Sequence, residues 1–236
     1  MKLTILGVNG PCPTEESGCS GYLVETDGGT RILIDCGSGV LPRLKKYAQP
    51  KDLSAMILSH LHFDHISDAL VMQYSLQLFP SERNLPVYAP EKPEAVRKML
   101  ESPYYDLYSH EDCMIGDARV SFVPSVHPFP GSSVAIFADG KKFVFTGDTN
   151  ENPELELFAD GADLLLADAA LPEAKWKPAS PHLSARRAGQ LAMNAGAKQL
   201  VLTHFFPQYP AEDLLQEAKS VYPEAEVGEV GAVRYI

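Results

Sequence analysis

Residues 59–65 read SHLHFDH, so three of the seven histidines in the chain lie within six positions beside one aspartate. If this stretch is extended, successive side chains alternate between faces, so His60, His62 and Asp64 would point one way and His65 the other. Neutral imidazole and carboxylate groups suit zinc, manganese or iron(II), and no cysteine is present to form a thiolate zinc finger. The stretch therefore predicts a metal site, but it supplies too few ligands for two ions.

Other apolar runs also end in histidine or aspartate: TGDT follows Phe145, ADAA follows Leu166 and THFF follows Leu202. In layered α/β proteins such strand ends collect functional side chains, so these loops are expected to converge. The candidate ligands form three groups around two divalent ions: His60, His62 and His127 for the first, Asp64, His65 and His204 for the second, and Asp148 as a bridge. Zinc is the expected metal, with manganese and iron as alternatives.

The apolar pattern predicts short alternating strands and helices. Strands are expected at residues 3–8, 22–25, 31–35, 55–58, 87–89, 120–123, 134–137, 142–146, 164–167 and 199–203, with 226–229 and 233–235 closing a sheet. Helices are expected at residues 40–48, 68–79, 91–100, 184–195 and 211–221. The helix at 184–195 is the clearest, because Ser184 is placed to cap it and Gly196 to end it.

The composition fits one globular domain spanning residues 1–236, with 45% hydrophobic and 22% charged residues. No apolar run reaches the length of a membrane span, and the first residues lack the apolar core of a signal peptide. We therefore expect a cytoplasmic protein with reduced cysteines and no membrane partner. The net charge of −11 weakens the case for a long nucleic acid partner.

Taken in order, these motifs resemble the metallo-β-lactamase superfamily, whose members carry HxHxDH, a later histidine, a bridging aspartate and a final histidine. Within it the chain is most similar to the ribonuclease Z and ElaC-like branch of phosphodiesterases. The matching segments are ILGVNGPCPT, SGCSGYLVE, ILIDCGSG, FTGDT and PHLSARRAGQLA. The resemblance implies an α/β fold, the αββα four-layer sandwich, in which helices flank two mixed sheets and the metal centre lies at one edge.

The resemblance also implies a proton relay in which Asp168 orients His182, the general acid. The segment around Asp168 reads ADAA where the branch carries HEAT, so this carboxylate is one methylene shorter. Asp64 is expected both to bind metal and to orient the nucleophile. Asp35, at the end of ILID, is a candidate for holding a ligand histidine or a turn.

His127 and Asp148 lie only 21 positions apart, and the residues between them suffice for two strands and a turn at Asp139 and Gly140. Ribonuclease Z enzymes, which the chain resembles, bind transfer RNA with a long arm. In the shorter bacterial type this arm is inserted between the two corresponding ligands, and the interval in this chain is too short to hold it. Transfer RNA is therefore not expected as a partner. A small nucleotide or other phosphodiester, hydrolysed through a metal-bridging hydroxide, is preferred.

Three alternatives stay open. The first is a ribonuclease Z-like nuclease that processes RNA. The second is a hydrolase of lactones, thioesters or carboxylic esters, because the same hydroxide attacks carbonyl carbon. The third is a non-catalytic metal-binding protein, although a structural site would be closed by four ligands that typically include cysteine.

Several residues have no role in the predicted metal site. His110 is left over and is expected to be an ordinary surface or loop histidine. Two aromatic groups, in PYYDLYSH and FFPQY, could stack on a nucleobase or pack in the core: Tyr104, Tyr105 and Tyr108, and Phe205, Phe206 and Tyr209. The apolar segment DALVMQYSLQLF is open between core packing and a homodimer contact.

Overall fold

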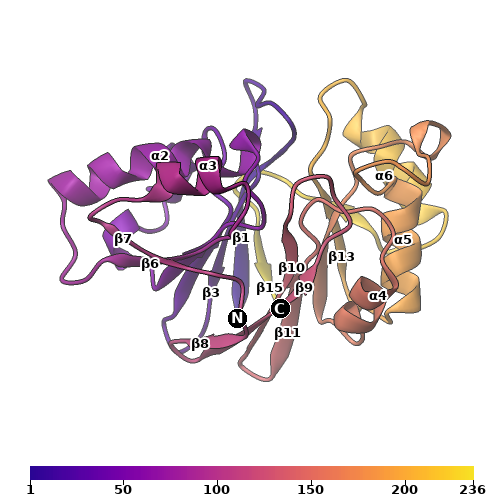
Figure 1. The fold of residues 1–236 in the computed structure, drawn as a ribbon. Helices are drawn as coiled ribbons and strands as arrows, with labels where there is room; N and C mark the ends of the chain where they lie inside the picture. Colours follow the sequence, from indigo (N-terminus) through magenta and orange to yellow (C-terminus); the bar gives the residue numbers. More distant parts are fainter.

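Two β-sheets pack face to face, with helices on their outer sides, in a computed structural model that describes residues 1–236 (Figure 1). The first sheet has the order β15-β1-β3-β4-β5-β6-β7, and β2 pairs with β1. Its strands are β1 (Lys2–Asn9), β2 (Gly18–Cys19), β3 (Gly21–Glu25), β4 (Arg31–Ile34), β5 (Ala55–Ile57), β6 (Leu85–Tyr88), β7 (Tyr105–Tyr108) and β15 (Val233–Tyr235).

The second sheet has the order β14-β13-β12-β11-β10-β9-β8. Its strands are β8 (Cys113–Ile115), β9 (Ala118–Pro124), β10 (Ser132–Ala138), β11 (Lys141–Phe145), β12 (Leu164–Asp168), β13 (Leu200–Thr203) and β14 (Glu226–Val227). Both sheets mix parallel and antiparallel pairs, since β11, β12 and β13 run parallel whereas β9, β10 and β11 are antiparallel. The expected αββα architecture is confirmed.

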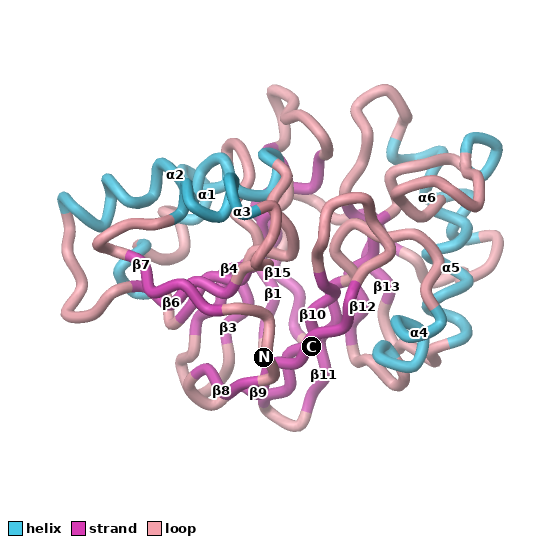
Figure 2. Tube along the Cα trace, in the orientation of Figure 1, coloured by secondary structure: helices cyan, strands magenta, loops and turns pink.

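The helices divide between the two outer faces (Figure 2). On the first sheet lie α1 (Val40–Leu44), α2 (Phe63–Leu78) and α3 (Glu94–Arg97), and on the second lie α4 (Pro153–Ala159), α5 (Ala185–Asn194) and α6 (Ala211–Lys219). Short 3-10 helices span Pro50–Asp52, Lys98–Leu100 and Glu173–Lys175. No helix combines the length and the apolar character needed to cross a bilayer.

Burial on both faces explains the nearly continuous apolar strands of the first sheet. In β4, Ile32 and Ile34 join the 42-residue core between the sheets, while Leu33 joins the 21-residue core beneath α1 and α2. Side chains that alternate along a strand must be apolar on both sides when each side is covered.

Each predicted element corresponds to one in the structure, but several bounds differ, and helix α1 ends at Leu44, four residues before the predicted end. Strands β2, β7 and β8 and helix α4 were missed, because β2 has only two residues, β7 and β8 are short edge strands with mixed polarity, and α4 has only seven residues. Helix α3 is a single turn followed by a 3-10 turn, shorter than expected. Helix α2 begins at Phe63, five residues before the predicted start.

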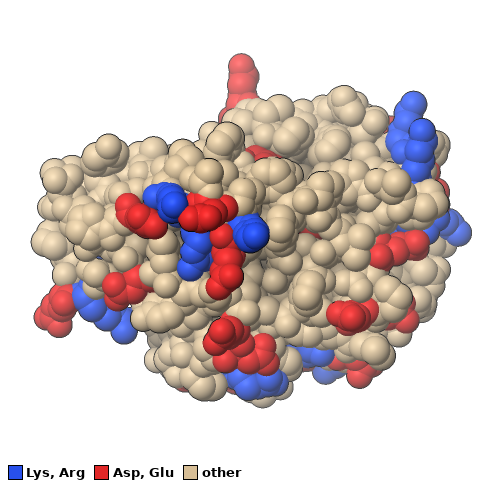
Figure 3. All heavy atoms as spheres, in the orientation of Figure 1, with Lys and Arg blue, Asp and Glu red and all other residues tan.

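The outer face of α2 is apolar and exposed. Phe63, Val71, Tyr74 and Leu78 are 61%, 52%, 66% and 72% exposed. The helix contains no lysine or arginine, and one of its two aspartates is buried while the other accepts from the backbone of α1. In Figure 3 the upper left of the surface, over the C-terminal half of α2, is tan, whereas red and blue atoms gather below it.

Candidate metal centre

The predicted ligands meet where β5, β11 and β13 end. The segment after β5 supplies His60 and His62 and then enters α2, whose first turn carries Asp64 and His65. The extended reading of residues 59–65 is therefore wrong for its second half, since the backbone is extended only as far as His62. The bend into the helix brings both halves of the motif to one place, and the carboxylate of Asp64 suits the positive N-terminal end of the helix.

One group of donor atoms comes from His60, His62, His127 and Asp148, and these atoms lie within 4.8 Å of one another. His60 Nε2 is 2.9 Å from His62 Nδ1 and 3.6 Å from Asp148 Oδ2. His60 and Asp148 are buried, whereas His62 and His127 are half-buried, so solvent reaches the centre from their side.

A second group comes from Asp64, His65 and His204. His204 Nε2 lies 3.3 Å from both Asp64 Oδ2 and His65 Nε2. Asp148 Oδ2 is 3.4 Å from His65 Nε2 and 3.3 Å from His204 Nε2, so the same oxygen faces both groups. The seven predicted ligands are thus brought together, with Asp148 between the two sets as expected.

This donor set fits divalent cations. Imidazole nitrogens and carboxylate oxygens point at one another across distances of 3.3–3.6 Å, which leaves several lone pairs facing a common space. Asp148 Oδ1 is buried and has no hydrogen-bond partner. Because a buried carboxylate oxygen without a partner is costly, a cation at this position would compensate it.

The electrostatics of the first group also suit metal binding. Burial and the neighbouring histidines hold the pKa of His60 well below its usual value and also lower the pKa values of His62 and His127. Burial alone would raise the pKa of Asp148, but His204, His65 and His60 outweigh it and hold that pKa well below its usual value. The three imidazoles are therefore neutral near pH 7, the form in which histidine binds metal.

His65 behaves differently because two carboxylates face it. Burial lowers its pKa, but Asp148 and Asp35 outweigh burial and raise it well above the usual value. His65 Nδ1 donates to Asp35 Oδ2 at 2.6 Å, which directs Nε2 into the second group. A cation at Nε2 would replace a proton there, so metal uptake is expected to depend on pH.

Asp35 is held in place by three further donors. Its Oδ1 accepts from the backbone of Ser59 at 2.7 Å, and its Oδ2 accepts from the hydroxyls of Ser59 and Ser20 at 2.9 and 3.0 Å. The interpretation of Asp35 as a carboxylate that fixes a ligand histidine agrees with this geometry. The serines carried no signal in the sequence, because only the fold brings them to Asp35.

Gly10 lets the loop after β1 lie directly against the second group. A Cβ added to Gly10 would lie 2.1 Å from His204 Nε2, which is far inside van der Waals contact. Any side chain at this position would therefore displace the ring of His204.

The proposed relay residues pair as expected. His182 Nδ1 is 2.9 Å from Asp168 Oδ2, although the aspartate is shorter than the glutamate of the related motif. Asp168 is itself oriented by the backbone N–H groups of Thr149 and Ala170, at 3.2 and 3.0 Å. Burial lowers the pKa of His182, but Asp168 outweighs burial and raises it to about 9. The ring of His182 stacks on that of His204, with centroids 5.0 Å apart.

Two aromatic rings, those of Phe129 and Phe206, contact histidines of the centre, and only Phe206 belongs to the aromatic groups considered for stacking on a nucleobase. Tyr105 and Phe205 are buried, and the Tyr105 hydroxyl donates to Ala69 O, so neither is free to stack on a base. Phe206 lies edge-on to His182, with centroids 5.2 Å apart. Phe129 packs on His62 at 3.9 Å and was missed, since it lies in a turn-rich segment without a pattern.

The sequence predicts an ordinary surface or loop histidine at position 110, and the structure places this residue in the loop between β7 and β8. His110 is half-buried there and is more tightly held than expected, with Nε2 3.1 Å from Leu58 O and Nδ1 2.9 Å from the Ser132 hydroxyl. Its ring stacks on Phe122 with centroids 4.6 Å apart. His110 therefore joins the two sheets and is not a metal ligand.

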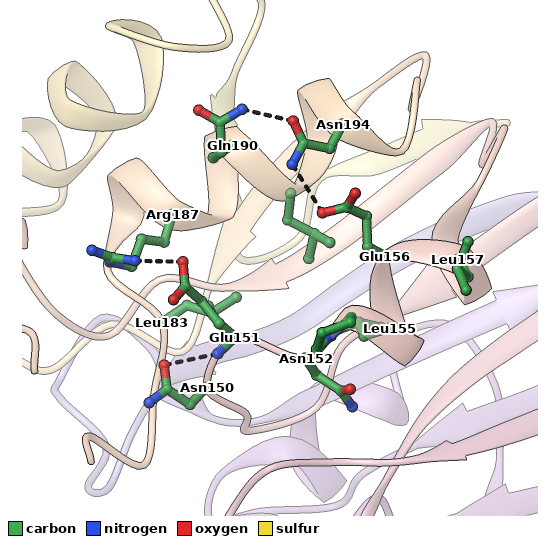
Figure 4. Close-up of a pocket in the computed structure, with 12 residues that line it drawn as sticks. Asn150, Glu151, Asn152, Leu155, Glu156, Leu157, Leu183, Arg187, Gln190 and Asn194 are labelled. Atoms are coloured by element: carbon green, nitrogen blue, oxygen red, sulfur yellow. Dashed lines mark hydrogen bonds and ion pairs between the residues drawn. The ribbon is translucent and has the colours of Figure 1, made fainter. Parts of the chain in front are cut away.

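A groove of about 510 Å³ lies between α4 and α5 (Figure 4). Leu155, Leu183 and Leu191 form part of its lining, and Glu151, Glu156, Arg187, Gln190 and Asn194 supply polar groups. None of the seven candidate ligands lines it, so the groove is separate from the metal centre.

Comparisons with known proteins agree with this fold and centre. Residues 30–205 match the family described as the β-lactamase superfamily domain. A Bacillus subtilis protein described as the probable metallo-hydrolase YhfI is 30% identical over 231 residues, which are 94% of both chains. The crystal structure of YhfI has a TM-score of 0.92 at 28% identity and covers 99% of this chain and 98% of that one.

More distant relatives include ribonuclease Z of Archaeoglobus fulgidus, which is 25% identical over 295 residues and covers 97% of this chain and 95% of its own. The structure of the short form of human tRNase Z shares the fold, with a TM-score of 0.81 at 20% identity, and the match covers 100% of this chain and 99% of that one. The chain therefore belongs to the β-lactamase superfamily and is a metal-dependent hydrolase with the metallo-β-lactamase fold.

Proposed function

We propose that this hydrolase is a phosphodiesterase acting on a small nucleotide or another small phosphodiester. The observation that carries the proposal is the 2.9 Å contact between His182 and Asp168 beside the ligand cluster. An alkoxide that leaves phosphorus must be protonated, and an oriented imidazole is suited to that task.

The proposed centre holds two divalent ions, with zinc first and manganese or iron as alternatives. His60, His62 and His127 would hold one ion, Asp64, His65 and His204 the other, and Asp148 both. Bound there, the ions would supply an activated water and would neutralise charge on a phosphoryl oxygen.

The chain's own side chains would supply the remaining steps. Asp168 would accept a hydrogen bond from His182 Nδ1–H. This contact would orient the ring so that Nε2 can donate a proton to the leaving oxygen. Asp64, next to the second group, would orient the nucleophile in addition to binding metal. The half-buried rings of His62 and His127 leave that side of the centre open to substrate.

The geometry between His127 and Asp148 supports a small substrate. This interval holds β10 and β11, which pair from Val134–Phe145 to Ala138–Lys141 and turn at Asp139 and Gly140. No arm projects from this hairpin, and the net charge is −11. We therefore propose that transfer RNA is not the substrate. The four unpaired cysteines support the further proposal that the protein works in the cytoplasm.

A nuclease acting on RNA is the second candidate, favoured by the similarity to proteins named ribonuclease Z. Hydrolysis of a lactone, thioester or carboxylic ester is a third candidate. The non-catalytic alternative has no support, because the relative YhfI, which is 30% identical over 94% of this chain, is named a probable metallo-hydrolase.

A substrate panel with purified protein tests the proposal. The protein loaded with zinc, manganese or iron is assayed on bis(p-nitrophenyl) phosphate, cyclic nucleotides, dinucleotides, precursor transfer RNA, a lactone and a thioester. We expect turnover of the small phosphodiesters and close to two ions per chain by elemental analysis. Turnover of the lactone or thioester alone would refute the substrate class.

Two variants give the panel its controls. Asp148→Ala is expected to lose metal and to abolish hydrolysis while the circular dichroism spectrum is kept. Asp160→Ala removes an exposed carboxylate at the end of α4 and is expected to leave both unchanged.

We also propose that the outer face of α2 pairs with the same face of a second copy. In a two-fold interface a patch meets itself, so it must be self-complementary, which an uncharged face is. Its three large side chains, Phe63, Tyr74 and Leu78, would bury roughly 100–150 Å² each, a substantial share of the roughly 800 Å² that each partner buries in a typical interface. The lack of charge there also avoids repulsion between two copies that each carry −11.

A further inference from the structure

One cation ties together the three segments that carry Asp148, Asp168 and His182. Arg187 lies in the first turn of α5, five residues after His182. Its guanidinium pairs with Glu151, three residues after Asp148, and with Glu173, five residues after Asp168. Figure 4 shows the contact with Glu151 beside the groove.

A tryptophan and an asparagine complete the connection. The guanidinium carbon of Arg187 lies 3.2 Å from the centre of the Trp176 ring. Trp176 Nε1 donates to Asn150 Oδ1 at 2.9 Å, and Asn150 Nδ2 donates to Pro178 O at 2.9 Å. The segment after Asp148 is thereby fastened to the segment after Asp168.

The start of α5 is fastened to the same carboxylate. The buried hydroxyl of Ser184, two residues after His182, donates to Glu173 Oε2, while Glu173 Oε1 accepts from Arg187 at 3.0 Å. Both oxygens of Glu173 therefore hold the segment that begins with His182. Loss of the arginine would leave this carboxylate with one partner fewer and would free the Glu151 segment.

The same contacts argue against a substrate-binding role for Arg187. Two carboxylates neutralise its charge, an aromatic ring covers one face, and its side chain is only 25% exposed. A phosphate would have to displace Glu151 or Glu173 to reach it. The planar, forked guanidinium suits simultaneous contact with two carboxylates and a ring, which an ammonium group cannot reproduce.

We propose that Arg187 is a positioning residue for the general acid: it sets the place of His182 relative to Asp148 by clamping the three segments. This inference rests on the proposed function, in which His182 protonates the leaving group. A displacement of about 1 Å at a reacting group can cost on the order of a hundredfold in rate. The effect of losing Arg187 should therefore appear in the step that needs the proton.

The test compares Arg187→Met with Arg186→Met in the metal-loaded protein. Arg186 is the neighbouring residue on the same helix, is exposed, and donates to Ser220 on the side of α6, so its loss changes the net charge equally without touching the clamp. Each variant is assayed on bis(p-nitrophenyl) phosphate, whose leaving group scarcely needs a proton, and on a dinucleotide, whose alkoxide does.

For Arg187→Met we expect a fall of about ten- to a hundredfold on the dinucleotide and less than about threefold on the p-nitrophenyl ester, with unchanged metal content. Arg186→Met should stay within about twofold of the wild type on both. Arg187→Lys should recover only part of the loss, because one ammonium cannot hold both carboxylates. Equal losses on both substrates, or no loss on either, would overturn the proposal.

Two further measurements do not depend on catalysis. Trp176 is the only tryptophan, so its fluorescence reports the arginine contact directly. Hydrogen exchange of the peptides covering residues 149–151 and 182–187 should become faster in Arg187→Met than in Arg186→Met. Unchanged exchange would overturn the clamp even if the rates fell.

These measurements separate the two proposals. If the wild type hydrolyses no phosphodiester, the proposed function fails, and the exchange and fluorescence results alone decide the clamp. If the wild type is active but His182→Ala loses equally on both substrates, the general-acid role fails and the inference about Arg187 falls with it, whatever the exchange shows.

Discussion

Acid should destabilise this protein through His110, the histidine that joins the two sheets. Burial lowers its pKa to about 4, and hydrogen bonds to the backbone carbonyls of Leu58 and Tyr88 offset only part of that effect. In the unfolded chain the group returns to about 6.5. The folded state therefore binds fewer protons than the unfolded state between these values, so stability is unaffected above about pH 6.5 and falls as the pH drops toward 4.

The size of the effect follows from the two pKa values. The full difference corresponds to about 3 kcal/mol at 1.36 kcal/mol per unit, reached only below pH 4. At pH 5.0 the loss is about 2 kcal/mol, and at pH 7.5 it is negligible. Other histidines also titrate in this range, so the contribution of His110 must be isolated by a variant.

His110→Gln provides that variant, since its amide can still donate to Leu58 O but does not titrate. Urea unfolding of both proteins is measured at pH 7.5 and pH 5.0 with a chelator, so that metal release does not contribute. The wild type should lose about 2 kcal/mol more than the variant on going to pH 5.0. The variant should itself be about 1 kcal/mol less stable at pH 7.5, because the bond to Ser132 is lost. Equal acid losses in the two proteins would refute the assignment of His110 as a neutral link between the sheets.

Three further outcomes are expected. Asp35→Asn removes the carboxylate that orients His65 and should weaken metal affinity by about 10- to 100-fold in a chelator competition, with little change in secondary structure. His182→Ala should slow hydrolysis of a dinucleotide by about 10²- to 10⁴-fold and that of bis(p-nitrophenyl) phosphate far less, and equal losses would remove the general-acid role. The double variant Tyr74→Lys, Leu78→Lys should convert a dimer to a monomer in light scattering without loss of metal, whereas a monomeric wild type would contradict the proposed pairing.

The candidate ligands were predictable because their chemistry is local. Histidine and aspartate directly after apolar strands carry a signal that needs no partner to be seen, and the strands themselves are recognisable as short apolar runs. Asp168 and His182 were predictable only through the family resemblance, and their 2.9 Å contact is a matter of fold.

Two features of the structure were not predictable from the sequence. The predicted start of helix α2 was five residues too late. Its first turn contains the polar ligands Asp64 and His65, which interrupt the apolar periodicity that indicates a helix. The contacts of His110 were not predicted because its partners, Leu58 and Ser132, lie 52 and 22 residues away in the chain. A single sequence contains no record of such distant pairs.

The residue types of SHLHFDH, TGDT and THFF are enough to establish metal-assisted hydrolysis, because few side chains bind divalent cations and they stand where strands end. The residues that hold these ligands in place cannot be recognised from their type alone. The bonds of Asp35 to His65, the approach of Gly10 to His204 and the clamp of Arg187 depend on distances between segments far apart in the chain. These contacts arise only when two sheets pack and their loops meet, since the packing geometry, rather than any local pattern, determines which side chains become neighbours.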